Sequence, residues 1–208
     1  MYKIKEIYYT LQGEGHHTGR PAIFCRFSGC NLWTGREGDR HKAICQFCDT
    51  DFWGVDGGNG GSYTADELAF KCKEIWPKSA GLPFVVFTGG EPLLQLDNEL
   101  LKSFKKEFFY CAVETNGTIE APDLLDWICM SPKANTEILL TTGDEIKIVQ
   151  PQLGIDPIDF SKYNYTHFYI QPMDNKFTLE NIQFCIDYCK KNPQWSLSVQ
   201  THKMIGIN

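Results

Sequence analysis

The sequence predicts an α/β fold in which a mostly parallel β-sheet forms an incomplete barrel. Apolar runs typical of strands alternate with helical segments, and such alternation produces right-handed βαβ units around a parallel sheet. No helical pattern is present between residue 130 and the strand predicted over residues 145–149. One crossover helix is therefore missing, and we expect the barrel to stay open.

The predicted strands are short apolar or aromatic runs that end at turn residues. They cover residues 2–11, 22–27, 83–87, 109–113, 127–130, 145–149, 167–170 and 195–199. Residues 28–61 lack periodicity and are rich in Gly, Asp and Asn. Loops of this length are uncommon unless they are functional or disordered. A group of cysteines lies inside this loop, which favours a functional role.

Helices are predicted from capping residues and apolar periodicity. Thr64 and Glu67 form a capping box that opens a helix, and Pro77 ends it near residue 76. Further helices are predicted over residues 97–106, 121–125 and 178–191. The last of these is expected to bury one face, made of Leu179, Ile182, Cys185, Ile186 and Cys189.

Length and composition favour a single globular domain spanning residues 1–208. The formal net charge is −6, and no run of five or more Lys or Arg is present. Proteins that bind nucleic acid normally show a basic stripe, so no nucleic-acid partner is expected. The first residues lack the apolar region of a secretory signal, and no apolar run approaches about 18 residues. We therefore expect a cytoplasmic protein with no membrane partner.

Polar side chains follow several of the predicted strands. In parallel α/β architectures the ligand site lies at the carboxyl ends of the strands. These positions should therefore meet at one site. The residues concerned are Thr88, Glu91, Glu114, Ser131 and Gln171.

Three of the nine cysteines have a spacing suited to a metal centre. Cys45 and Cys48 form a C-x-x-C motif, and Cys30 precedes it by fourteen intervening residues. Three thiolates can hold a four-iron cluster and leave one iron open for another ligand. Zinc usually takes four ligands, and His41 would then be the fourth. The cysteines alone leave both readings open. The other six cysteines lie in predicted strands and helices, where packing is the expected role.

The cysteines are accompanied by three more motifs, which are Leu11-Gln12-Gly13-Glu14-Gly15, Thr88-Gly89-Gly90-Glu91-Pro92 and Glu114-Thr115-Asn116-Gly117. This combination resembles the radical S-adenosylmethionine (SAM) superfamily, although the usual cysteine spacing there is C-x3-C-x2-C. The C-x14-C-x2-C spacing, followed by Asp49-Thr50, resembles the 7-carboxy-7-deazaguanine synthase family, some members of which carry an enlarged cluster loop. The resemblance covers almost the whole chain. It implies a truncated TIM-like barrel that holds a [4Fe–4S] cluster on Cys30, Cys45 and Cys48.

The resemblance also implies a SAM site. Phe47 would cover the adenine, and the Gly89-Gly90 pair would let the backbone approach SAM closely because glycine has no Cβ. Without the resemblance, the glycines suggest an ordinary turn and Lys133 a surface charge. The implied SAM residues are Phe47, Gly89, Gly90, Glu91, Glu114, Asn116, Ser131, Lys133 and Gln171.

The implied substrate is a flat polar pterin with a carboxylate, 6-carboxy-5,6,7,8-tetrahydropterin. Amide and carboxylate groups can read the donors and acceptors of its ring, and an Arg fork can bind its acid group. Thr50 would bind Mg²⁺ through its hydroxyl oxygen. Residues alone suggest a polar turn at positions 12–14 and a local turn at Thr50. The implied substrate residues are Gln12, Glu14, Arg26, Thr88, His202 and Asn208.

The implied reaction yields 7-carboxy-7-deazaguanine with loss of ammonia, on the route to queuosine and other 7-deazapurines. The resemblance implies that hydrogen is abstracted from carbon 6 of the pterin and that SAM is regenerated. It also implies a homodimer and an electron donor such as flavodoxin or ferredoxin. Two alternatives are a different radical SAM enzyme, such as an activase that makes a glycyl radical on a partner protein, and a zinc-binding module without enzymatic activity.

Overall fold

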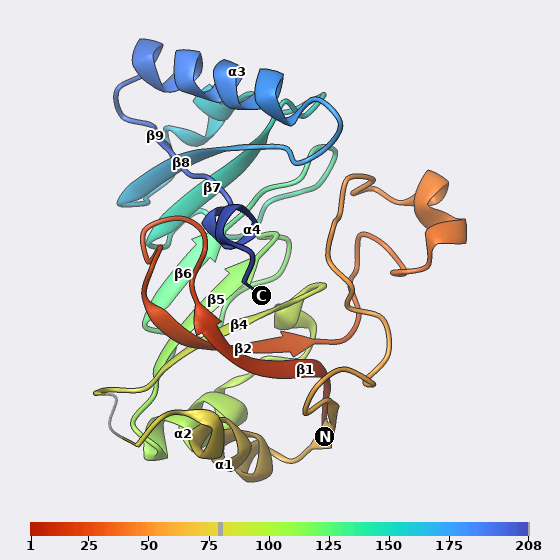
Figure 1. Ribbon diagram of the computed structural model, residues 1–208, viewed down its shortest axis with the longest axis vertical. Helices are drawn as coiled ribbons and strands as arrows, with labels where there is room; N and C mark the ends of the chain where they lie inside the picture. The colour runs from red at the N-terminus through yellow and green to blue at the C-terminus, as the bar shows by residue number, and fades with distance from the viewer. Residues whose placement is uncertain (79–80, 208) are drawn as a thin grey trace.

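The structure is a computed structural model that describes residues 1–78 and 81–207 (Figure 1). Its described part holds nine strands in one sheet. The strands are β1 (Tyr2–Leu11), β2 (Pro21–Phe27), β3 (Gly61–Tyr63), β4 (Phe84–Gly89), β5 (Tyr110–Thr115), β6 (Trp127–Met130), β7 (Glu145–Gln150), β8 (His167–Pro172) and β9 (Ser196–Leu197). The helices are α1 (Ala65–Ile75), α2 (Asn98–Lys106), α3 (Thr178–Lys191) and α4 (Thr201–Ile205).

The sheet is mostly parallel and does not close. Its strand order is β3-β1-β2-β4-β5-β6-β7-β8-β9. All pairs from β2 to β9 are parallel, whereas β1 pairs antiparallel with both β2 and β3. The first and last strands in this order, β3 and β9, do not pair with each other. The barrel that the sheet forms is therefore incomplete. The predicted α/β class and truncated barrel are confirmed.

Helices α1, α2 and α3 cover the outer face of the sheet. Thr64 and Glu67 make the predicted capping box, in which each side chain accepts from the other's backbone N–H. In Figure 1, α1 and α2 lie together at one end of the sheet, and α3 lies at the other, where it packs on β8 and β9. The core between these layers is made of apolar side chains such as Phe27, Phe87 and Phe104, none of which is exposed.

Polar residues occupy the opposite, inner face of the sheet. Side chains at paired positions of parallel strands point to the same face. Glu114, Cys129 and Glu145 occupy one such row across β5, β6 and β7. Lys147 lies two residues after Glu145 on β7, so its side chain points to the same face, and it pairs with Tyr169 on β8. The inside of this open barrel therefore carries carboxylates and an ammonium group rather than the usual branched apolar side chains.

Some expected elements differ from the structure. Residues 121–125 form a turn instead of a helix, because the connection from β5 to β6 is short and Asp126 closes it by accepting from the Cys111 N–H at 2.7 Å. The last strand is confined to Ser196–Leu197, and β3 and α4 were not expected. Leu179 is 80% exposed, since it lies in the first turn of α3, and Asn181 is buried in its place.

Candidate active site

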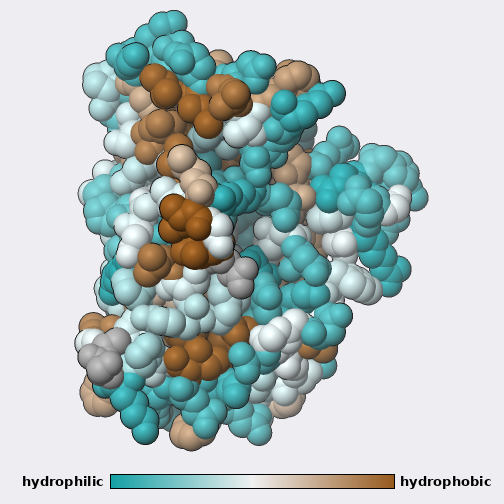
Figure 2. All heavy atoms as spheres, in the orientation of Figure 1, coloured by the Kyte–Doolittle hydropathy of each residue, from teal (hydrophilic) through white to brown (hydrophobic). Residues whose placement is uncertain are grey.

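A cavity of about 400 Å³ opens at the carboxyl ends of the parallel strands, between them, the cluster loop and the C-terminal segment. Its volume lies in the range of small-molecule sites. Figure 2 shows the polar surface of the loop that stands away from the body beside this hollow. Most of the side chains predicted from the sequence meet there. They are Gln12, Glu14, Arg26, Cys30, Cys45, Phe47, Cys48, Thr50, Thr88, Gly89, Gly90, Glu114, Asn116, Ser131, Lys133, Gln171 and His202.

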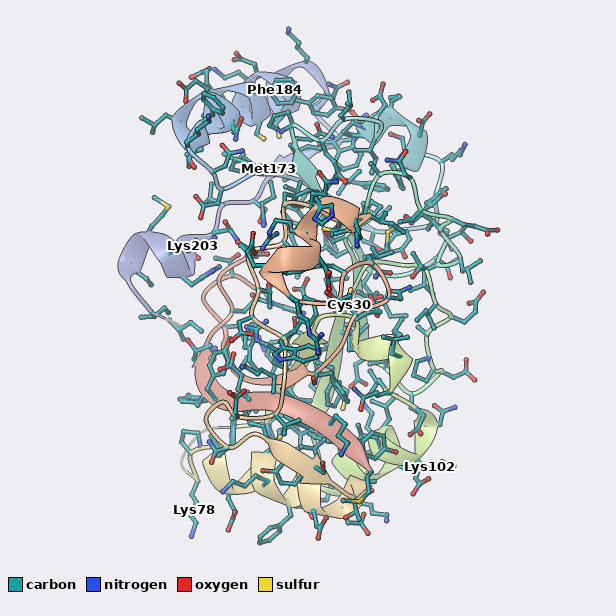
Figure 3. All side chains as sticks on the ribbon, turned by 90° about the vertical axis from the view of Figure 1, so that its right-hand side faces the viewer. Cys30, Lys78, Lys102, Met173, Phe184 and Lys203 are labelled. Atoms are coloured by element: carbon teal, nitrogen blue, oxygen red, sulfur yellow. The ribbon has the colours of Figure 1, made fainter. Side chains whose placement is uncertain are left out.

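The three expected cluster cysteines share one side of this cavity. Cys30 follows β2, and Cys45 and Cys48 lie in the long loop (Figure 3 labels Cys30). A single zinc ion needs thiolates within about 2.3 Å. Among the described residues, no three His, Cys, Asp or Glu side chains converge closely enough to hold one ion. Cys30, Cys45 and Cys48 all line the one cavity, and their thiols interact electrostatically with one another. Three thiolates in one lining are the donor set that a [4Fe–4S] cluster with one open iron takes. His41 is exposed and does not line the cavity.

Aromatic and cationic side chains hold the cluster loop in shape. The Arg40 guanidinium lies 4.1 Å from the centre of the Trp33 ring, and Trp33 packs edge-on against the buried Phe52. Arg40 also donates to the carbonyl oxygens of Gln46 at 2.9 Å and Cys48 at 3.0 Å. These bonds fix the C-x-x-C turn, although residues 28–61 contain little regular structure.

The two glycines after β4 are required by the packing of the protein on itself. A Cβ on Gly90 would lie 2.1 Å from the Gly29 carbonyl oxygen and 2.7 Å from the Cys30 Cβ. Gly89 has a φ of +141°, and its Cβ would lie 2.3 Å from the Phe27 carbonyl oxygen. The pair lets the end of β4 approach the turn that carries Cys30. The sequence suggested the approach of a ligand, and the structure adds this second reason.

Glu91 lies behind the cavity wall and does not line the cavity. Its carboxylate is fully buried and accepts from the Thr115 hydroxyl and from the backbone N–H groups of Leu93 and Asn116 at 2.8–2.9 Å. Burial raises the pKa of Glu91, and the three donors oppose that rise. The side chain therefore braces the end of β4 against the end of β5.

A partly buried lysine, Lys133, lies close to the thiols. The Lys133 ammonium donates to the Ser131 carbonyl at 2.6 Å and to its hydroxyl at 2.8 Å. Burial raises the pKa of the Cys45 and Cys48 thiols, and the Lys133 charge opposes this rise. Burial also lowers the pKa of Lys133 itself. A cation at this position favours thiolates, the form that binds metal.

The deep end of the cavity holds a network of charged and amide groups. The Lys147 ammonium contacts Glu14 Oε2 at 2.7 Å and Glu114 Oε2 at 2.9 Å. Gln12 donates to Glu114 Oε1 at 3.1 Å, and Gln200 donates to Glu14 Oε1 at 2.9 Å. The sequence assigned Glu114 to SAM, but it bonds to Gln12 directly and is linked to Glu14 through Lys147, and both of these are expected substrate residues.

Arg26 lies on the cavity wall with some of its donors in use. Its Nε donates to Glu6 Oε1 at 2.8 Å, and its Nη2 donates to the Tyr8 hydroxyl at 3.0 Å. The guanidinium has five N–H donors, so it retains capacity for a ligand carboxylate. On the far wall, Gln171 is buried and accepts from the Ser198 hydroxyl at 3.0 Å.

The family follows from comparison with known proteins. The family model of the radical SAM superfamily matches residues 40–192. Proteins named 7-carboxy-7-deazaguanine synthase from Bradyrhizobium diazoefficiens and Burkholderia multivorans are 54% and 50% identical over 207 residues, covering 99% of both chains. The chain belongs to the 7-carboxy-7-deazaguanine synthase family. It is a radical SAM enzyme, and this membership implies a [4Fe–4S] cluster and SAM.

A solved structure supports the same family. The crystal structure of QueE from Escherichia coli matches with a TM-score of 0.74 and 28% identity, covering 97% of this chain and 94% of that one. The similarity extends over nearly the whole chain and therefore includes the open barrel. Neither alternative is supported: the relatives carry the synthase name, which excludes a zinc-binding module and gives no support to an activase.

Sequence reasoning missed several residues around the cavity of this synthase family member. Lys147, Asp174 and Lys203 all line it. Lys203 on α4 contacts Asp49 Oδ2 and Asp174 Oδ2, both at 2.6 Å, and so joins the C-terminal segment to the cluster loop and to the end of β8 (Figure 3). Lys147 had a signal, because charges that alternate with Ile in an interior parallel strand indicate a polar barrel interior. Asn208 lies outside the described residues.

Proposed function

We propose that this chain converts 6-carboxy-5,6,7,8-tetrahydropterin to 7-carboxy-7-deazaguanine with loss of ammonia, in the biosynthesis of queuosine and other 7-deazapurines. The observation that carries the proposal is one cavity that joins the three cysteines to the network of Gln12, Glu14 and Glu114. Full-length identity of 50–54% to proteins named for this product supports it.

The cysteines Cys30, Cys45 and Cys48 would hold the cluster, and the cluster with bound SAM would supply a 5′-deoxyadenosyl radical. The remaining residues on that side would orient SAM and exclude water. Gln171, Ser131 and Lys133 offer polar atoms in the cavity wall, and Phe47 offers an aromatic face. Gly89 and Gly90 would present a wall without side chains, and Asn116 would add its amide group to it. Glu91 would hold that wall in place from behind.

The substrate would lie between the deep network and the mouth of the cavity. Carboxylates accept only, so Glu14 and Glu114 suit the amino and ring N–H groups of a pterin. Arg26 would bind the substrate carboxylate by its free donors. Thr88 and His202 line the same space and would contact the substrate from opposite walls. We include Asn208 in the substrate set on the basis of the family resemblance.

Thr50 would ligate Mg²⁺ through its hydroxyl, with the substrate carboxylate and waters as further ligands. Mg²⁺ prefers oxygen ligands and retains several waters, so a site with one protein ligand fits its chemistry. We expect Thr50→Val to abolish stimulation of turnover by Mg²⁺, and Thr50→Ser to retain it. Equal stimulation in the Val variant and the unmodified enzyme would remove Thr50 from the site.

The direct test is turnover by the anaerobically reconstituted enzyme. Iron, sulfide, SAM, a reductant, Mg²⁺ and 6-carboxytetrahydropterin would be supplied, and 7-carboxy-7-deazaguanine sought by mass spectrometry. The proposal predicts this product from the unmodified enzyme and none from Cys45→Ala. Formation of 5′-deoxyadenosine without the deazaguanine would reject the substrate while leaving the radical SAM chemistry intact.

The proposal extends to the cellular setting. We propose one functional unit over residues 1–208, supported by a single sheet and one contiguous core in the described residues. A reducing cytoplasm suits the nine cysteines, all of them unpaired in the described structure. Among the described residues, no helix is both long and apolar enough to cross a bilayer.

A second copy and an electron donor complete the proposed assembly. Met204 and Ile205 on α4 are 75% and 64% exposed, and Figure 2 shows apolar atoms gathered on this face. We propose that such a surface serves a homodimer, which light scattering would test. Cys30 and Cys48 are half-buried, so a flavodoxin or ferredoxin could reach the cluster from the loop side. Product formed with such a donor in place of dithionite would support this partner.

A further inference from the structure

A buried lysine at the deep end of the cavity has no part in the function described so far. Lys147 lies on β7, and its side chain is only 4% exposed. A buried ammonium is costly unless it is paired and hydrogen-bonded. Its partners are Glu14 and Glu114, which come from the loop after β1 and from β5. Groups from three distant parts of the chain thus converge on one cation.

Each oxygen of the two carboxylates already has one partner before any ligand binds, and each can still accept a second hydrogen bond. Each gives one oxygen to Lys147 and the other to an amide, from Gln12 for Glu114 and from Gln200 for Glu14. Their positions are therefore set by the protein and do not depend on the ligand. A site that is ordered in advance loses less freedom when it binds.

Other titratable groups also surround Lys147. Cys129 faces it from β6 and Glu145 from its own strand, while His202 on α4 and the cation of Lys133 lie further away. Burial raises the pKa of Glu145 to about 7 even though Lys147 opposes the rise. Burial also raises the pKa of the Cys129 thiol. Both groups hold their protons more strongly than usual, and the carboxylates in direct contact with Lys147 are Glu14 and Glu114.

The effect of this charge is clearest at Glu14. Burial alone would raise the pKa of its carboxyl, but the ammonium of Lys147 brings it down to about 2. Without that cation, two carboxylates that are only 17% and 20% exposed would stand close together, and one would retain a proton. A protonated carboxyl donates as well as accepts, so the pattern read along the ligand's edge would change.

We infer that Lys147 is a positioning residue that keeps Glu14 and Glu114 as pure acceptors, so that the cavity selects heterocycles with N–H donors along one edge. This inference rests on the proposed function. A pterin presents a 2-amino group and a ring N–H to such acceptors. The corresponding lumazine, 6-carboxy-5,6,7,8-tetrahydrolumazine, presents a carbonyl oxygen in place of the 2-amino group and would be rejected.

The test is Lys147→Met in the reconstituted holoenzyme. We expect KM for the pterin to rise about tenfold to hundredfold, the range for a lost hydrogen bond to a charged group. The variant should also lose kcat/KM as pH falls from 8 to 6, because one carboxyl then takes a proton, whereas the unmodified enzyme shows no such loss from Glu14. Discrimination against the lumazine should shrink in parallel.

Three further variants make the test decisive. Lys147→Arg keeps the charge and should restore the pH profile. The double variant Lys147→Met, Glu114→Gln carries one carboxylate fewer, so no excess negative charge remains near residue 147. It should therefore fold even if Lys147→Met alone does not. Its kcat/KM should still fall at low pH, because Glu14 takes up a proton. Lys190→Met, at an exposed position on α3, is the control.

An unchanged KM, pH profile and lumazine discrimination in folded Lys147→Met would overturn the inference. Calorimetry would measure the affinity of each holoenzyme for the pterin directly. It distinguishes failure of the inference about Lys147 from failure of the proposed function. If the unmodified protein binds the pterin but makes no deazaguanine, the reaction assignment fails while the effect of Lys147 on binding is still measured.

Discussion

Replacing Glu91 by Gln distinguishes a bracing role from a ligand role for this carboxylate. The side chain has no exposed surface. One oxygen accepts from the Thr115 hydroxyl at 2.8 Å and the Leu93 N–H at 2.9 Å, and the other accepts from the Asn116 N–H at 2.8 Å. Glutamine has the same shape but only one oxygen that can accept. Its NH₂ group would face one of the donors that now bond to Glu91.

The expected cost follows from these contacts. Loss of one hydrogen bond to a charged group costs about 1.5–3 kcal/mol, and a buried donor left without a partner adds to it. Removal of the buried charge offsets part of this cost, since burial raises the pKa of Glu91 and so disfavours the ionised form. A net loss of about 2 kcal/mol is therefore expected. For a chain of this length it corresponds to a fall in Tm of about 4–8 °C.

The assay is thermal unfolding followed by circular dichroism under anaerobic conditions. Glu120→Gln changes an exposed carboxyl in the loop after β5 and should leave Tm within a degree or so. A Tm for Glu91→Gln equal to that of the unmodified protein, together with a selective loss of SAM affinity, would refute the bracing role. It would restore the role that the sequence suggested.

Three more perturbations test other parts of the structure. Gly90→Ala should lose most of the bound iron, because its Cβ would lie 2.1 Å from a backbone oxygen of the cysteine-bearing turn, whereas Gly38→Ala, in open space on the same loop, should keep it in an iron assay. Cys45→Ala should abolish the cluster absorbance, and Cys185→Ala, which changes a core packing residue, should retain it. Burial raises the folded pKa of Glu145 to about 7, above its unfolded value of about 4.5. Its contribution to stability is therefore full below pH 4.5 and lost as pH rises through 7, and Glu145→Gln should flatten urea stability across this window. An equally steep pH dependence in that variant would contradict the shift.

Local patterns predicted most of the fold. The capping box at Thr64 and the short buried strands carry their own signals, so α1, β4, β5 and β7 lie close to their expected positions. Tertiary context decided the remainder. Leu179 has the helical spacing of a core residue, but it lies in the first turn of α3 and is exposed. The two-residue β9 and the short α4 have too few residues to give a periodic signal.

The candidate site divides in the same way. Residues in motifs after strands could be found, because the topology brings those ends together. What a side chain contacts could not be predicted: Glu91 points into the wall, and Glu114 points to the network of Gln12. Lys147 lies inside a strand, outside every motif, and its partners are 133 and 33 residues away in sequence.

The most direct measurement of the central claim is multiple turnover with SAM limiting. Reconstituted enzyme would receive excess 6-carboxytetrahydropterin, Mg²⁺ and reductant, and both 7-carboxy-7-deazaguanine and 5′-deoxyadenosine would be quantified. Our account predicts more than one deazaguanine for each SAM supplied, with little accumulation of 5′-deoxyadenosine. Stoichiometric 5′-deoxyadenosine with no deazaguanine would contradict it.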